Sequence, residues 1–258
     1  MYILASDYDG TLNRGGISAR DLEAVERFRE AGNVFVIVSG RDGHMYEYEC
    51  KGRIKLDYVL GMNGGIVTIA DGDRAGEIVV CDMVKNNGCI RWIAEHIAKN
   101  YGEFLGCAIM LDRVTFHGGY PDGLIDGDGK VKYAPLAEAD RIGEFSMLNS
   151  RCETEELTAK CVAEINEKWG TVVNATQNGV CIDIPPAGMD KGAGVARLAS
   201  MLGVPDDNIW CVGDNYNDIS MIKRFHGCCV ENGVPALKAA AEGIYPSVAD
   251  VIEHIMSL

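Results

Sequence analysis

The stretch from Leu4 to Asn13 reads L-A-S-D-Y-D-G-T-L-N, with two aspartates one residue apart at the end of an apolar run. Residues i and i+2 of a strand point to the same face, so an unbroken strand would set the carboxylates of Asp7 and Asp9 side by side. Gly10 allows the chain to turn sharply after Asp9 and to direct the second carboxylate away from the first. The stretch therefore predicts a buried strand that ends in a polar site.

The segments that surround this stretch alternate between strand and helix patterns. Strands are predicted at residues 2–6, 34–38 and 57–60, a helix with Ser18 as its N-cap at 18–31, and a hairpin at 66–70 and 77–80. The run V-F-V-I-V at 34–38 contains no polar residue, as is typical of a parallel strand covered on both faces. Strand, helix and strand thus form a βαβ unit.

From about Asp82 the pattern changes to that of a separate α+β layer. We predict helices at residues 85–100 and 154–169, strands at 104–111, 113–117, 145–148, 172–175 and 180–184, and a solvated hairpin at 120–130. After Pro185-Pro186 the α/β alternation resumes, with helices at 190–202, after Asn217 and at 235–241, and strands at 209–212 and 227–230.

The predicted fold class is therefore α/β with a discontinuous core. Residues 1–81 and 186–258 are expected to form one Rossmann-like open parallel sheet, and residues 82–185 an inserted α+β cap domain.

The composition excludes several kinds of partner. A formal net charge of −14 over 258 residues argues against nucleic acid, but one buried lysine and a divalent cation can still attract a small anion. The ten cysteines include no C-x-x-C pair and mostly lie in apolar runs, which indicates reduced structural thiols. With no signal-peptide pattern and no apolar run of about 18 residues, we expect a cytoplasmic protein without a membrane partner.

Polar residues gather where the predicted parallel strands end, which is where open α/β sheets bind ligands. The segments are Asp7–Leu12, Ser39–Arg41 and Gly213–Asp218, together with Lys191 at the start of a helix. Four carboxylates at one rim, those of Asp7, Asp9, Asp214 and Asp218, would repel one another unless a cation lay among them. Ligands that offer only oxygen atoms favour Mg²⁺.

These residue types suit phosphoryl transfer. One carboxylate can attack phosphorus and form an aspartyl-phosphate, while a second acid protonates the leaving oxygen and then deprotonates water. The hydroxyls of Thr11 and Ser39, with backbone N–H groups beside glycines such as Gly40, can hold the phosphoryl oxygens. Lys191 would neutralise the charge shared by the nucleophile and the phosphate.

Four segments, in this order, resemble the four motifs of the haloacid dehalogenase (HAD) superfamily: Asp7-x-Asp9-Gly-Thr-Leu, Ser39-Gly-Arg, Lys191-Gly and Gly213-Asp214-x-x-Asn217-Asp218. The insertion between the second and third motifs, Asn63-Gly near its boundary, and Asn232 six residues before Lys238 are similar to the Cof-like sugar-phosphate phosphatases of that superfamily. The resemblance covers essentially the whole chain.

The resemblance implies a role for each matching residue. Asp7 would be the nucleophile and a Mg²⁺ ligand, Asp9 the acid/base that also coordinates through its backbone carbonyl, and Asp214 a further ligand. Ser39 and Lys191 would bind the phosphoryl group, and Asn217 and Asp218 would support the phosphate and the metal-bound water.

Several residues have a structural alternative. Ser39 could cap the segment after Arg41, and Arg41 is expected to fix its loop rather than to contact substrate. Asn63 is either a turn former or a substrate contact at the boundary of the inserted domain, and Asn232 is interpreted first as a turn residue. Among the histidines, only His117 is a candidate to face substrate.

Together these features predict a Mg²⁺-dependent phosphatase for a small phosphorylated metabolite, a sugar phosphate by resemblance, in a monomer or weak homodimer. The inserted domain is expected to close over the site and select the leaving group. Two alternatives stay open: a phosphomutase of the phosphomannomutase type, which the acidic cap disfavours, and a phosphometabolite-binding protein without turnover. Dehalogenation is disfavoured because that branch does not need the second aspartate.

Overall fold

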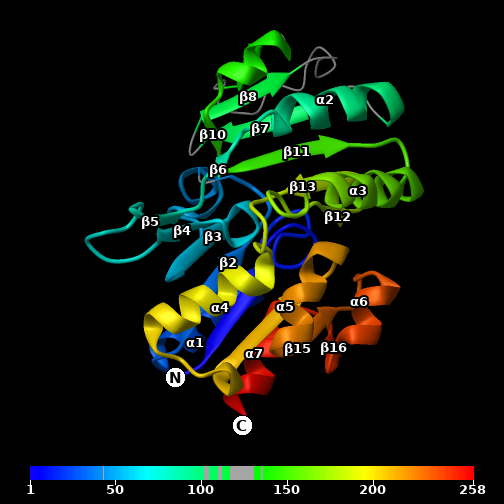
Figure 1. Cartoon of the computed structure of the whole chain (residues 1–258). Helices are drawn as coiled ribbons and strands as arrows, with labels where there is room; N and C mark the ends of the chain where they lie inside the picture. Colours follow the sequence, from blue (N-terminus) through cyan, green and yellow to red (C-terminus); the bar gives the residue numbers. More distant parts are fainter. Residues whose placement is uncertain (43, 102–104, 110–111, 117–130, 135) are drawn as a thin grey trace. The chain divides into compact units, whose positions relative to one another are not determined.

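The computed structural model describes the chain apart from residues 43, 102–104, 110–111, 117–130 and 135, and divides it into two compact units (Figure 1). Unit 1 consists of Met1–Val80 and Met189–Leu258, and unit 2 of Cys81–Gly188. Each unit has its own hydrophobic core.

Unit 1 is built on one eight-stranded sheet, in the order β16-β15-β14-β1-β2-β3-β4-β5. The six strands from β16 to β3 run parallel, and β4 returns antiparallel to β3. The strands are β1 (Ile3–Asp7), β2 (Val34–Val38), β3 (Tyr58–Gly61), β4 (Ile66–Ile69), β5 (Ile78–Cys81), β14 (Ile209–Gly213), β15 (His226–Val230) and β16 (Gly243–Tyr245). The predicted open parallel sheet is confirmed, and β16 is a strand that the prediction missed.

Helices cover both faces of this sheet because its central strands are apolar on both sides. Leu4 of β1 and Phe35 of β2 pack with α1 and α7, whereas the neighbouring residues Ala5 and Val36 pack with α4, α5 and α6. The helices are α1 (Ala19–Glu30), α4 (Lys191–Leu202), α5 (Ile219–Arg224), α6 (Pro235–Ala240) and α7 (Val248–Met256), and a π-helix spans Tyr46–Cys50. Ser18 caps α1 as predicted, by accepting a hydrogen bond from Asp21 N at 3.0 Å.

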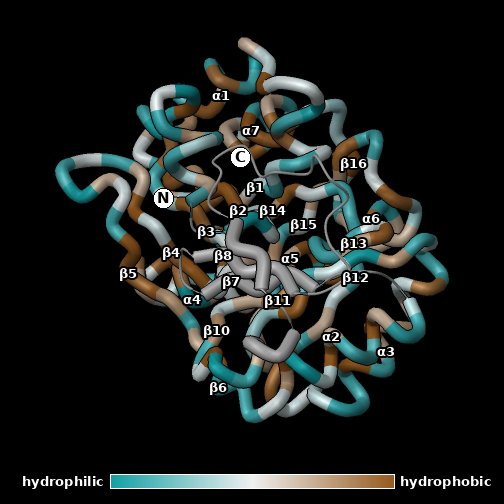
Figure 2. The backbone as a smooth tube through the Cα atoms, turned by 90° about the horizontal axis from the view of Figure 1, so that it is seen from above, coloured by the Kyte–Doolittle hydropathy of each residue, from teal (hydrophilic) through white to brown (hydrophobic). Residues whose placement is uncertain are grey.

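Unit 2 packs helices α2 and α3 against a mostly antiparallel sheet, in which β8 pairs with β9 in parallel. Its six-stranded sheet has the order β12-β13-β11-β7-β8-β9, and β10 pairs separately with β6. Alternating hydrophilic and hydrophobic bands along α2 and α3 are visible in Figure 2, since each helix buries one face. The elements are β6 (Val84–Lys85), α2 (Cys89–Asn100), β7 (Leu105–Ile109), β8 (Asp112–Phe116), β9 (Val131–Ala134), β10 (Glu144–Phe145), β11 (Met147–Arg151), α3 (Glu155–Trp169), β12 (Thr176–Asn178) and β13 (Cys181–Ile184).

The predicted helix at 85–100 starts four residues too early. Its first residues belong to β6 and to a turn in which Asn87 and Gly88 have φ values of 43° and 83°, outside the helical region. Asn86 begins this turn, and its side chain accepts a hydrogen bond from Ile90 N at 3.0 Å. The helix therefore begins at Cys89.

The predicted strand at 172–175 is wrong, because β12 begins only at Thr176. The side chain of Asn166 in α3 accepts from Ala175 N at 2.8 Å and donates to Ala175 O at 2.8 Å. These bonds occupy the backbone groups that a strand would use. The predicted strand at 145–148 likewise divides, with Ser146 between β10 and β11.

Two expectations, for His117 and for the hairpin at 120–130, lie outside the described residues. Among the helices that the structure does describe, none is both long enough and apolar enough to cross a bilayer.

Candidate active site

Three adjacent parallel strands, β14, β1 and β2, bring three predicted site residues to one edge of the unit 1 sheet. Asp7 is the last residue of β1, Ser39 follows β2 and Asp214 follows β14. After Asp7 the chain turns at Gly10, which has a φ of 85°. A Cβ at Gly10 would lie 2.4 Å from Asp214 Oδ2, so only glycine allows this close approach.

The first feature of the site is a buried group of charges, the Lys191 cluster (Asp7, Lys191 and Asp218). Lys191 Nζ lies 2.6 Å from Asp7 Oδ1 and 2.6 Å from Asp218 Oδ1. The side chain of Lys191 is 1% exposed, that of Asp7 7% and that of Asp218 0%. Asp190 positions the lysine, because it caps α4 by accepting from Ala193 N at 2.8 Å. Lys191 thus enters the site from the first turn of the helix.

Asp218 uses both carboxylate oxygens within the protein. Its Oδ1 binds Lys191, and its Oδ2 accepts hydrogen bonds from Asp214 N and Asn215 N, each at 2.9 Å. Gly213 makes room for this carboxylate, since a Cβ there would lie 2.5 Å from Asp218 Cγ. This geometry suits the supporting role predicted for Asp218 and fixes the loop that carries Asp214.

The carboxylates of Asp7, Asp214 and Asp218 offer oxygens that all lie within 4.8 Å of one another. Asp7 Oδ2 is buried and accepts no hydrogen bond within the described part of the chain. Three carboxylates beside a single ammonium group leave an excess of negative charge, which a divalent cation would balance. The orphaned oxygen and the all-oxygen donor set fit a hard cation.

The pKa shifts of the buried residues are consistent with this fit. Burial raises the pKa of Asp7 well above its usual range, with Lys191 opposing this shift and Asp218 and Asp214 adding to it. Burial and the charge of Asp218 also raise the pKa of Asp214. For Lys191, burial lowers the pKa, but the charges of Asp218 and Asp7 outweigh it and keep the amine protonated. A bound cation would favour the ionised carboxylates.

The second feature is a partly exposed group, the Arg41 cluster (Tyr8, Asp9, Arg41 and Glu49), in which Tyr8 is buried. Arg41 Nε lies 2.7 Å from Asp9 Oδ2 and Arg41 Nη2 lies 2.8 Å from Asp9 Oδ1, a bidentate ion pair. The two side chains are 44% and 50% exposed. The sequence predicted that Arg41 fixes its loop, but the contact of its guanidinium with Asp9 was missed. Coordination by the Asp9 backbone carbonyl stays a prediction.

The other predicted phosphate-binding residues lie along the same edge. The hydroxyl of Thr11 donates to Asp214 Oδ1 at 2.9 Å, and Asn217 is buried in the helical turn Tyr216–Asp218. Ser39 Oγ accepts from Arg41 N at 3.1 Å, as a capping side chain does, and Gly40 lies between the two. Phosphate binding by these residues remains a prediction.

Asn63 forms part of a strained turn after β3. Its φ is 52°, that of the preceding Met62 is 51°, and the side chain of Asn63 is buried. Asn63 N donates to Ser39 O at 2.9 Å and Met62 N donates to Arg41 O at 2.6 Å. Asn63 thus has the turn conformation that one alternative requires, and its contact with substrate stays a prediction. Asn232 Nδ2 donates to Gly10 O at 2.8 Å and ties its loop to the first motif.

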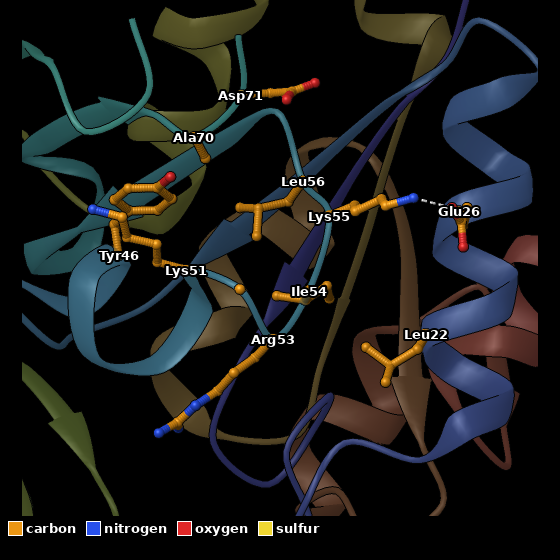
Figure 3. Close-up of a pocket in the computed structure, with 11 residues that line it drawn as sticks. Leu22, Glu26, Tyr46, Lys51, Arg53, Ile54, Lys55, Leu56, Ala70 and Asp71 are labelled. Atoms are coloured by element: carbon orange, nitrogen blue, oxygen red, sulfur yellow. Dashed lines mark hydrogen bonds and ion pairs between the residues drawn. The ribbon is translucent and has the colours of Figure 1, made fainter. Parts of the chain in front are cut away.

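A surface pocket of about 410 Å³ lies elsewhere on unit 1, between α1 and the segment that precedes β3 (Figure 3). Leu22, Ile54 and Leu56 contribute apolar side chains to it, and Lys55 on its rim pairs with Glu26 of α1. Because it lies at the amino end of β3, it is separate from the edge that carries the motif residues.

Comparison with known proteins identifies the family. Residues 4–254 match the family model described as haloacid dehalogenase-like hydrolase. The chain belongs to this family. The resemblance predicted from the four motifs is confirmed at this level, and the protein is a HAD-like hydrolase.

Relatives of this HAD-like hydrolase span most of its length. A phosphoglycolate phosphatase of Pyrobaculum aerophilum is 26% identical, with 93% of this chain and 87% of the relative covered. An HMP-PP phosphatase of Citrobacter koseri is 25% identical, with 92% and 86% covered. The crystal structure of SMU.1108c from Streptococcus mutans UA159 superposes with a TM-score of 0.82 at 20% identity, over 100% of both chains. The structure of BT4131, a sugar phosphatase of HAD subclass IIB, superposes with a TM-score of 0.79 at 17% identity, also over 100% of both chains. These likenesses confirm the predicted fold class.

Proposed function

We propose that this HAD-like hydrolase is a Mg²⁺-dependent phosphatase that removes phosphate from small metabolites through an aspartyl-phosphate on Asp7. The observation that carries the proposal is the state of the Asp7 carboxylate. Lys191 holds one oxygen at 2.6 Å, while the other oxygen is buried and has no hydrogen-bond partner among the described residues. Oxygens of Asp7 and Asp214 lie within 4.8 Å of each other. An anchored carboxylate at a cation-binding edge has the features of a nucleophile for phosphate esters.

The proposed reaction has two half-reactions, and Asp7 and Asp9 take part in both. In the first, an oxygen of Asp7 forms a bond to phosphorus, the bond from phosphorus to the leaving oxygen breaks, and Asp9 gives that oxygen its proton. In the second, Asp9 takes a proton from water, which attacks phosphorus and releases phosphate from Asp7. Lys191 stabilises the negative charge throughout, and a Mg²⁺ ion held by Asp7 and Asp214 supplies further charge neutralisation when bound.

The substrate class follows from what the relatives have in common. Their names specify different compounds, among them phosphoglycolate and 5-amino-6-(5-phospho-D-ribitylamino)uracil, at 25–26% identity to this chain. The shared chemistry is a small phosphorylated metabolite, and we place sugar phosphates first among the candidates. Selection among them is assigned to unit 2, as the resemblance implies for the inserted domain.

The test is phosphate release from sugar phosphates, nucleotides, pyridoxal phosphate and flavin mononucleotide, with Mg²⁺ and with a chelator. We expect Mg²⁺-dependent release from a few compounds, and loss of that release in Asp7→Asn and Asp9→Asn. Near-wild-type turnover by Asp7→Asn would refute the nucleophile. Isomerisation of a hexose 1-phosphate without phosphate release would instead identify a mutase, and binding without turnover a metabolite-binding protein.

A further inference from the structure

The Arg41 cluster contains one residue, Glu49, that no motif predicts. Two nitrogens of Arg41 bind Asp9, and the third, Nη1, lies 2.7 Å from Glu49 Oε1. The other oxygen of Glu49 accepts a hydrogen bond from the hydroxyl of Tyr8 at 3.1 Å and a longer one from the exposed Arg53 Nη1 at 3.4 Å. The guanidinium carbon of Arg41 also lies 5.6 Å from the centre of the Tyr8 ring. All three guanidinium nitrogens and one of its faces are thus engaged.

Glu49 is the less exposed of the two acids in this cluster. It belongs to the π-helix Tyr46–Cys50, a rare element that is found disproportionately at functional sites. Tyr46 and Cys50, at the two ends of this helix, are buried in the core of unit 1. The side chain of Glu49 is 24% exposed, against 50% for Asp9. Mobility should therefore decrease from Asp9 through Arg41 to Glu49.

We propose that Glu49 is a positioning residue for catalysis: it orients Arg41, and Arg41 orients the carboxylate of Asp9. The inference rests on the proposed role of Asp9 as acid/base. A proton donor must come within about 2.6–3.2 Å of its target, and an error of about 1 Å can cost ~10²-fold in rate. A half-exposed aspartate cannot keep such a position alone. The bidentate pair fixes the plane of the carboxylate, and Glu49 prevents the long arginine side chain from moving away.

The neighbouring Glu47 shows what an ordinary surface pair on the same π-helix looks like. Its Oε2 lies 2.8 Å from Lys51 Nζ, the side chains are 47% and 57% exposed, and neither makes an ion pair with the Arg41 cluster among the described contacts. Exposed pairs of this kind contribute little to stability. Glu47→Gln is therefore a matched control: it removes the same charge from the same helix.

The experiment compares phenyl phosphate with p-nitrophenyl phosphate, two esters of similar shape whose leaving oxygens differ in their need for a proton. The constant kcat/KM covers the steps up to departure of the leaving group, so the ratio of kcat/KM for phenyl to p-nitrophenyl phosphate reports proton donation. We expect Glu49→Gln to lower this ratio about 10-fold, a part of the ~10²–10⁴-fold that a general acid contributes. Asp9→Asn should lower it further, and Glu47→Gln should leave it within about 2-fold of wild type.

Tyr8→Phe is the second variant, since it removes only the hydroxyl that holds Glu49. It should lower the same ratio by about 3-fold, in the same direction as Glu49→Gln. An unchanged ratio in both variants, or equal losses with both esters, would overturn the positioning role. If Asp9→Asn left the ratio unchanged, the proposed acid/base role of Asp9 would fail, and this inference with it.

Discussion

The Lys191 cluster and the Arg41 cluster lie in the same unit, after strands of the same sheet, yet they hold their charges in opposite ways. In the Lys191 cluster the side chains are at most 7% exposed, and one ammonium faces two carboxylates. In the Arg41 cluster the ion pair with Asp9 is about half exposed, and the guanidinium makes contacts on several sides. Burial makes an unpaired charge costly, whereas a single exposed ion pair contributes little free energy.

The largest loss of stability and activity should follow from removal of the buried ammonium group of Lys191. We expect Lys191→Met to abolish phosphatase activity and to lower the free energy of unfolding by about 3–5 kcal/mol, because the carboxylates of Asp7 and Asp218 would remain buried without the positive charge that they share. Urea denaturation of the metal-free protein measures this change. A loss below about 1 kcal/mol would mean that water reaches the cluster and that its burial does not govern it.

A smaller change in stability, of opposite sign, is expected for substitution of Asp214. In the metal-free protein Asp214→Asn should leave stability unchanged or raise it, because the carboxylate that it removes lies within 4.8 Å of those of Asp7 and Asp218. Wild type should gain about 2.7 kcal/mol from Mg²⁺ at 100 times its dissociation constant, and the variant should lose most of that gain. Thermal unfolding with Mg²⁺ and with a chelator tests both statements. An equal response of the two proteins to Mg²⁺ would exclude Asp214 as a ligand.

The same carboxylates predict how stability depends on pH. The folded, metal-free protein raises the pKa of Asp7 and of Asp214, so it binds their protons more tightly than the unfolded chain does. Their contribution to stability is therefore present below the ordinary carboxyl pKa and is lost as the pH rises through the raised values. Mg²⁺ should flatten this decline by favouring the ionised forms. The test is to measure the unfolding midpoint as a function of pH, with and without Mg²⁺. The same decline of the midpoint in both conditions would contradict this account.

The smallest change in stability is expected for substitutions in the Arg41 cluster. Arg41→Met should alter the free energy of unfolding by less than about 1 kcal/mol, since its pairs are partly solvated. Its kcat/KM for phosphate esters should nevertheless fall at least 10-fold, because Asp9 loses its bidentate partner. Steady-state kinetics measure the change in kcat/KM, and urea denaturation measures the change in the free energy of unfolding. If activity and stability fell together, as expected for Lys191→Met, the contrast between the two clusters would not hold.

The sequence was most informative where topology aligns residues. Asp7, Ser39 and Asp214 follow neighbouring parallel strands, so their meeting at one edge could be predicted from apolar runs alone. It was least informative where a side chain distant in sequence takes over the backbone, as Asn166 does at Ala175. Glu49 was missed for a related reason. Its contacts with Tyr8 and Arg41 depend on a π-helix, whose period matches no common pattern of apolar residues.

The central position of β1 has a consequence for the order of folding. One neighbour, β2, follows soon after β1 in the chain, but the other, β14, is made only after the whole of unit 2. Lys191, the partner of Asp7, also comes after unit 2. During synthesis, the segments of unit 2 are therefore complete while β1 still exposes one edge and Asp7, the proposed nucleophile, still lacks Lys191. Completion of the parallel sheet and assembly of the buried part of the catalytic site thus become one late event, reached only when the C-terminal segment has emerged.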